Sequence, residues 1–276
     1  MTEVSALTVP VALTIAGSDS GGGAGIQADL RTFSFHCVHG TSAITCVTAQ
    51  NTLGVNRVDP LPAAAVVAQI QAVITDIGVQ ATKTGMLLNQ EIILAVARQV
   101  TELKIANVVV DPVMVSRAGA QLIDDAAVAC LREKLIPQAT IVTPNRYEAQ
   151  MLGGLEIQSL ADMEQAAQRI HKLGAQAVLV KGGGMPGSLR GVDVWFDGDR
   201  LLTLTTSLVE TTNTHGTGCT LAAAIAANLA RGKDLLTAVQ LAKDYVTNAL
   251  NYALSIGKGQ GPVGHFFPLL AKTTEL

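Results

Sequence analysis

Short apolar runs alternate with longer amphipathic stretches along most of the chain, and turn residues separate them. Runs rich in β-branched residues predict strands, whereas apolar residues at three- and four-residue spacing predict helices. We expect strands at residues 11–16, 42–48, 81–84, 107–111, 140–142, 177–181, 192–196 and 201–205. We expect helices at residues 24–36, 62–77, 90–103, 124–135, 159–173, 218–230 and 235–255.

This alternation predicts an α/β fold whose mostly parallel sheet is covered by helices on both faces. Ligands of such sheets bind beyond the carboxyl ends of the strands, so motifs that directly follow strands are the functional candidates. No internal repeat or linker-like tract divides the sequence. We therefore expect a single domain over residues 1–276.

Composition narrows the classes of function. Hydrophobic residues make up 49% of the chain and aromatic residues only 3%, which favours an aliphatic, well-packed core. The net charge of −3 comes without a basic block and argues against nucleic acid as a partner. The cysteines lack metal or disulfide spacing, and neither a signal peptide nor a bilayer-spanning stretch is recognisable. We expect a cytoplasmic enzyme that acts on a small molecule, away from membranes.

The strongest local signal is the segment Asn213-Thr214-His215-Gly216-Thr217-Gly218-Cys219-Thr220, which directly precedes an apolar helix. Its glycines permit a sharp turn that presents backbone N–H groups, and the helix start adds the positive end of its dipole. Gly216, Thr217 and Gly218 therefore predict an anion hole for a phosphoryl group. Cys219 falls in the first turn, where we expect the dipole to lower its thiol pKa. The alternative is an ordinary glycine-rich loop with a buried cysteine, and we interpret His215 as positional.

A second glycine-rich segment, residues 17–29, follows the first strand. Part of it, Gly23-Ala24-Gly25-Ile26-Gln27-Ala28, fits the dinucleotide pattern G-x-G-x-x-A, which leaves a nicotinamide-dependent oxidoreductase as an alternative. Such a site also needs an acidic residue after the second strand, where this chain has Ala49-Gln50-Asn51. We favour a substrate-binding loop with Asp29 turned toward a polar ligand, against a plain surface carboxylate.

Other strand ends also carry polar groups, although a Walker A loop is absent from the sequence. Asn145 and Glu148 lie one helical turn apart and offer oxygen ligands suited to Mg²⁺, although such pairs are often helix caps. Lys181 ends a strand where anionic phosphates could lie, although a lysine there is usually solvated. Asp111 places a carboxylate at the same edge, and Met86 is a candidate wall for a flat ligand, with core packing as the alternative.

Taken together and in this order, these segments resemble the hydroxymethylpyrimidine kinase / phosphomethylpyrimidine kinase family of thiamine biosynthesis, within the ribokinase-like superfamily. The resemblance runs from about Val11 to His265. It rests on residues 16–30, 48–52, 83–87, 110–114, 143–145, 180–183, 213–220 and 257–265. It implies a ribokinase-like three-layer α/β/α fold. It also implies phosphorylation of 4-amino-5-hydroxymethyl-2-methylpyrimidine, and then of its monophosphate, with ATP and Mg²⁺.

The resemblance further implies roles for individual residues. Those surrounding the pyrimidine would be Gly17, Asp29, Gln50, Met86 and Val113. Those of the anion hole and proton transfer would be Gly216, Thr217, Gly218 and Cys219. Those near the nucleotide would be Lys181, Asn145 and Glu148, with Asp111 and Glu148 as metal ligands. Related proteins suggest a homodimer. The nearest alternative function is that of a pyridoxal kinase, and a non-catalytic binding protein is a further alternative. Residues 115–121 are a candidate lid.

Overall fold

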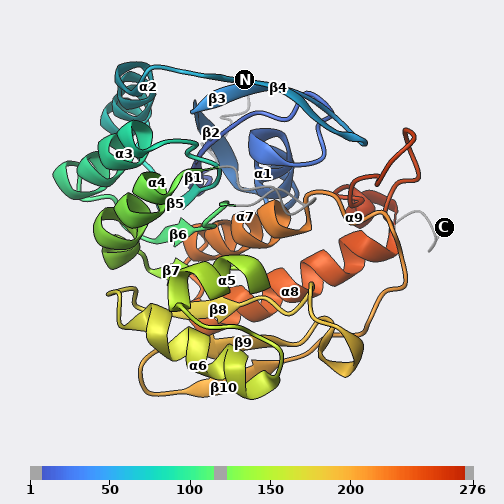
Figure 1. Ribbon diagram of the computed structural model, residues 1–276. Coiled ribbons are helices and arrows are strands. Elements are labelled where there is room, and N and C mark those ends of the chain that lie inside the picture. The colour runs from blue at the N-terminus through green and yellow to red at the C-terminus, as the bar shows by residue number, and fades with distance from the viewer. Residues whose placement is uncertain (1–7, 115–122, 271–276) are drawn as a thin grey trace.

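The computed structural model describes residues 8–114 and 123–270, so the candidate lid at 115–121 lies outside the described part of the chain. Its centre is an eight-stranded sheet with the strand order β10-β9-β8-β7-β6-β5-β1-β2 (Figure 1). The parallel strands are β1 (Val11–Ala16), β2 (His39–Ile44), β5 (Ala81–Thr84), β6 (Val108–Val110), β7 (Ile141–Val142) and β8 (Val178–Val180). The antiparallel strands at one edge are β9 (Asp193–Phe196) and β10 (Leu201–Leu204).

Helices cover both faces of this sheet, which confirms the predicted fold class (Figure 1). One face carries α1 (Gly25–Phe35), α7 (Thr217–Ala230) and α8 (Leu235–Asn251). The other carries α2 (Ala63–Asp76), α3 (Gln90–Glu102), α4 (Asp125–Cys130), α5 (Arg146–Gly153) and α6 (Leu160–His171). The short α9 (Phe267–Leu270) follows near the C-terminus. No helix of the described residues is long and apolar enough to cross a membrane.

The two cores follow from the period of the strands, because successive side chains point to opposite faces. In β6, Val108 and Val110 pack into the core with α2 to α6, whereas Val109 packs into the core with α7 and α8. Helix α7 is buried on nearly all sides, between the sheet and α8, and its alanines permit this close approach. The N-terminus of α7 is thereby held firmly against the sheet.

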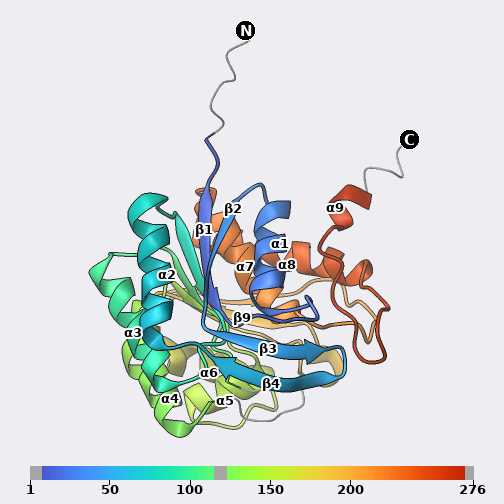
Figure 2. The ribbon, with the colours of Figure 1, turned by 90° about the horizontal axis from the view of Figure 1, so that it is seen from above.

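The prediction of one strand over residues 42–48 was wrong. Strand β2 ends at Ile44. Strand β3 (Cys46–Asn51) then pairs with β4 (Gly54–Pro60) in a separate two-stranded sheet, which runs across Figure 2. Thr45 fixes the break, since its N–H donates to Ala16 O at 3.1 Å and its hydroxyl to Met86 O at 2.7 Å. These bonds bring the start of β3 to the ends of β1 and β5.

Two predicted helices also have different bounds. The stretch 124–135 is helix α4 followed by a π-helical turn, Leu131–Leu135, and a 3-10 turn, Ile136–Gln138. Pro137 lacks the N–H needed to continue an α-helix there. The last long helix ends at Asn251 rather than at residue 255.

Candidate active site

The carboxyl ends of β1, β5, β6 and β8 meet at one edge of the sheet, and the first turn of α7 lies against this edge. Asp111 directly follows β6, and Lys181 directly follows β8. A Cβ on Gly218 would lie 3.3 Å from Lys181 Nζ and 4.0 Å from Asp111 Oδ2, so the helix start faces both side chains. The glycine keeps this approach open.

Lys181 and Asp111 form an ion pair at this edge. The distance from Lys181 Nζ to Asp111 Oδ1 is 2.9 Å, and the Thr143 hydroxyl lies 3.4 Å from the same oxygen. The Lys181 side chain is 13% exposed and that of Asp111 is 3% exposed. Burial alone would lower the Lys181 pKa, but the negative charges of Asp111 and Glu148 raise it. A fixed cation therefore stands beside the start of α7.

Asn145 and Glu148 form a reciprocal cap on α5. The Asn145 side chain accepts from Glu148 N at 3.1 Å, and Glu148 Oε2 accepts from Asn145 N at 2.8 Å. Burial raises the Glu148 pKa to about 7, although Lys181 lowers it. Helix capping is thus an observed role of this pair, and it holds the Glu148 carboxyl beside the Lys181–Asp111 pair.

The carboxylates of this edge limit the kind of metal site that is possible. Among the described residues no group of three or more His, Cys, Asp and Glu side chains could hold a metal ion. Asp111 and Glu148 nevertheless suit Mg²⁺, which commonly keeps several waters and takes one or two carboxylates together with substrate phosphates. They do not suit a closed protein cage.

Cys219 lies in the first turn of α7, as predicted, but the prediction of a lowered thiol pKa was wrong. Burial raises the Cys219 pKa to about 11. The positive charge of Lys83 lowers it, whereas the negative charges of Asp29 and Asp111 raise it further. Since desolvation outweighs the neighbouring cation, the resting side chain is a thiol.

Asp29 is neither on the surface nor open to a ligand. Its Oδ2 accepts from the Thr14 hydroxyl at 2.7 Å and from Lys83 Nζ at 2.9 Å. The side chains of Lys83 and Asp29 are 0% exposed. Sequence reasoning gave Lys83 no role, although a lysine inside the buried strand Ala81–Thr84 requires a buried partner and so signals a pair.

Gly17 and Met86, both predicted to surround the pyrimidine, lie next to each other. A Cβ on Gly17 would lie 2.9 Å from Met86 Cε and 2.6 Å from Cys46 Sγ, so any larger residue there would displace both side chains. Cys46 is buried and was not among the predicted residues. Val113 lines a small cavity with Gly85, the neighbour of Met86.

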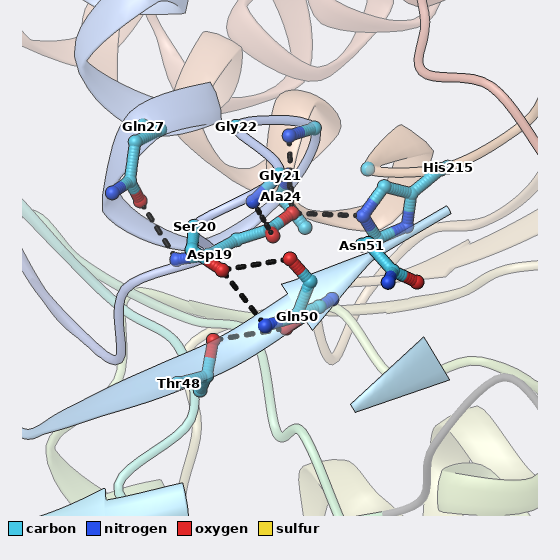
Figure 3. A network of polar contacts seen from close by, with 12 residues as sticks. Asp19, Ser20, Gly21, Gly22, Ala24, Gln27, Thr48, Gln50, Asn51 and His215 are labelled. Carbon is cyan, nitrogen blue, oxygen red and sulfur yellow. Dashed lines mark hydrogen bonds and ion pairs between the residues drawn. The ribbon is translucent and has the colours of Figure 1, made fainter. Parts of the chain in front are cut away.

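Gln50 lies on β3, opposite the glycine-rich loop (Figure 3). Its backbone N–H donates to the Ser20 hydroxyl at 2.8 Å, and that hydroxyl donates to Gln50 O at 2.7 Å. The Thr48 hydroxyl lies 3.3 Å from Gln50 Oε1. The glycine-rich loop therefore holds the Gln50 backbone through Ser20, and Thr48 contacts the Gln50 side chain.

Comparison with known proteins gives a consistent set of similarities. The family model described as phosphomethylpyrimidine kinase matches residues 19–264. The hydroxymethylpyrimidine/phosphomethylpyrimidine kinase of Synechococcus elongatus is 62% identical, over 95% of this chain and 100% of that protein. The ADP complex of Bacillus subtilis pyridoxal kinase has a TM-score of 0.88 at 40% identity, covering 94% and 98% of the two chains. The phosphomethylpyrimidine kinase from Clostridium difficile has a TM-score of 0.79 at 41% identity, covering 87% and 99%.

Proposed function

The chain belongs to the phosphomethylpyrimidine kinase family, and we propose that it phosphorylates hydroxymethylpyrimidine and then its monophosphate at the edge where α7 meets the sheet. ATP is the phosphate donor, and the two products belong to thiamine biosynthesis. The observation that carries this proposal is the position of the α7 start against the Lys181–Asp111 pair. The oxidoreductase alternative is thereby set aside.

The start of α7 provides the anion hole of this proposal. Gly216 adopts a left-handed conformation with φ 82°, and α7 begins at the next residue. The Thr217 N–H already donates to Thr214 O at 3.3 Å. The N–H groups of Gly218 and Cys219 are therefore better placed to donate to a negatively charged phosphoryl oxygen. Helix-start amides have no intrahelical acceptor, and they stabilise the negative charge that develops on a transferring phosphoryl group.

Lys181, Asp111 and Glu148 lie on the nucleotide side of this site. Lys181 offers a positive charge to the ATP phosphates, and the two carboxylates would hold Mg²⁺ through its waters. When bound, this metal neutralises charge on the phosphates. Asn145 contributes indirectly, because its cap on α5 fixes Glu148.

Gly17, Gln50, Met86 and Val113 form the pyrimidine side of the proposal. Met86 gives a flat ring an apolar contact, and Gln50 offers an amide to the polar edge of the ring. Asp29 does not touch the ring in this proposal; it contributes indirectly, through its bond to Lys83.

Cys219 stands where the hydroxymethyl oxygen must approach. That oxygen bonds to the γ-phosphorus as the bond to ADP breaks, and its proton passes late, in a loose transition state, to an oxygen of the transferred phosphoryl group. Because burial keeps the resting Cys219 protonated, we assign most of the rate to alignment and charge stabilisation rather than to a standing thiolate base.

Purified protein with Mg-ATP tests this function against the pyridoxal alternative. We expect ADP release with hydroxymethylpyrimidine and with its monophosphate, at a higher kcat/KM than with pyridoxal. Turnover of pyridoxal alone would contradict the pyrimidine proposal. The expected homodimer and cytoplasmic location stay predictions, and sedimentation of the same sample tests the dimer.

A further inference from the structure

Asp19 ties the glycine-rich loop into a compact turn (Figure 3). Its Oδ1 accepts from Gly21 N at 2.8 Å, and its Oδ2 accepts from Gly23 N at 3.0 Å and Ala24 N at 2.8 Å. The Asp19 side chain is 2% exposed. Burial raises its pKa, but these N–H donors and His215 together lower it, so the group is a carboxylate.

His215 reaches the same carboxylate from the segment that leads into the anion hole. Its Nε2 lies 2.8 Å from Asp19 Oδ2 and must donate, because the carboxylate has no proton to give (Figure 3). The His215 backbone N–H donates to Gly261 O at 3.1 Å, and its carbonyl accepts from Val263 N at 3.2 Å. His215 therefore joins three segments that are distant in the sequence.

The two loops approach each other as closely as backbones can. A Cβ on Gly216 would collide with Gly23 O, and one on Gly23 would collide with the His215 ring. Gly216 is also the left-handed residue that precedes the anion hole. Any shift of the Asp19 loop thus changes the path of the chain into α7.

Asp19 and His215 bond to each other and to the backbone of the glycine-rich loop. Each oxygen of Asp19 is occupied by backbone donors, and Nε2 of His215 is occupied by Asp19. The Nε2 hydrogen of His215 is therefore committed to the contact between the two loops. A positioning role fits these contacts better than a catalytic one.

We propose that Asp19 and His215 are a pair of positioning residues that lock the substrate loop to the anion-hole loop and so align acceptor and phosphoryl group. This inference rests on the proposed function, and it adds the mechanical coupling between the two halves of the site. Small misplacements of reacting groups strongly reduce rate, so the coupling acts mainly on kcat.

The test compares His215→Leu, which removes the donor, with His215→Gln, which keeps a side-chain N–H. We expect His215→Leu to lower kcat by about 100-fold with little change in either KM, and His215→Gln to recover most of it. Activity is measured with whichever alcohol the wild type phosphorylates fastest, so a wrong substrate assignment does not affect the comparison. Asp19→Asn, and the double variant with His215→Leu, complete a cycle that must be non-additive.

His36→Leu is the matched control, because His36 is also buried and its Nδ1 bonds to Thr32 O at 2.8 Å. It lies at the end of α1, away from both loops. Amide hydrogen exchange supplies a readout without any substrate: exchange at 19–24 and 213–218 should quicken in His215→Leu but not in His36→Leu. Wild-type kcat in His215→Leu, or additive effects of the two changes, would overturn the proposal.

Discussion

Two lysine–aspartate pairs flank the first turn of α7, and they differ in one property. In both pairs the Nζ to carboxylate distance is 2.9 Å. Lys83 and Asp29 are 0% exposed, whereas Lys181 is 13% exposed. The enclosed pair can neutralise its charges only internally, but the open lysine can exchange its carboxylate for a ligand phosphate. Two ion pairs of equal length therefore have different roles: Lys83–Asp29 stabilises the fold, and Lys181–Asp111 is available for ligand binding.

Position relative to the strand end explains this difference. Lys83 is the third residue of β5 (Ala81–Thr84) and points into the packing under α1 and α7. Lys181 comes one residue after β8, where a single parallel bridge to Asn145 ends the pairing of this part of the sheet. Because ligands bind beyond the carboxyl ends of parallel strands, only the second lysine reaches that space.

The largest expected effect is a loss of protein stability when the enclosed pair is broken. Lys83→Met leaves the Asp29 carboxyl buried, with one oxygen that already lacks a hydrogen-bond partner among the described residues. We expect a loss of about 3–5 kcal/mol in the free energy of unfolding, measured by urea denaturation. Adding Asp29→Leu removes the second charge and should restore most of the lost free energy of unfolding.

Lys243→Met offers a control for this loss, because Lys243 pairs with Asp193 at 2.5 Å and both side chains are at most 8% exposed. It should destabilise similarly without involving Cys219. A loss below about 1 kcal/mol in Lys83→Met, the range of exposed pairs, would show that Lys83 and Asp29 are not enclosed in solution.

Sequence reasoning located the open pair and missed the role of the enclosed one. Asp111, Lys181 and the start of α7 each follow from a strand–turn or turn–helix boundary, which local patterns mark well. The pairing of Lys83 with Asp29 joins residues 54 positions apart and depends on how α1 packs on β5. The prediction of a lowered Cys219 pKa failed for the same reason, because the desolvation of the thiol depends on that packing and not on the helix start.

The next effect concerns Cys219, which lies between the two pairs. A pKa of about 11 in place of 9.0 lowers the thiolate fraction at pH 8 by about 100-fold, and iodoacetamide reacts with thiolates. We expect alkylation of Cys219 to be slow at pH 8 and to accelerate up to about pH 11. The exposed Cys37 is the reference in the same digest by mass spectrometry. A Cys219 rate that levels off near pH 8 would contradict the raised pKa.

The smallest effect is expected at the open pair, and it should appear in binding rather than in folding. Lys181→Met makes the same substitution as Lys83→Met, but the Asp111 that it leaves lies beside the partly exposed edge, where water can replace the ammonium. We expect a smaller loss in the free energy of unfolding than in Lys83→Met, and KM for ATP to rise by about tenfold, or 1.4 kcal/mol. Parallel urea denaturation and initial-rate kinetics measure both numbers. If Lys181→Met destabilised the fold as much as Lys83→Met while ATP kinetics stayed unchanged, exposure would not distinguish the pairs, and the nucleotide side of the site would have to be placed elsewhere.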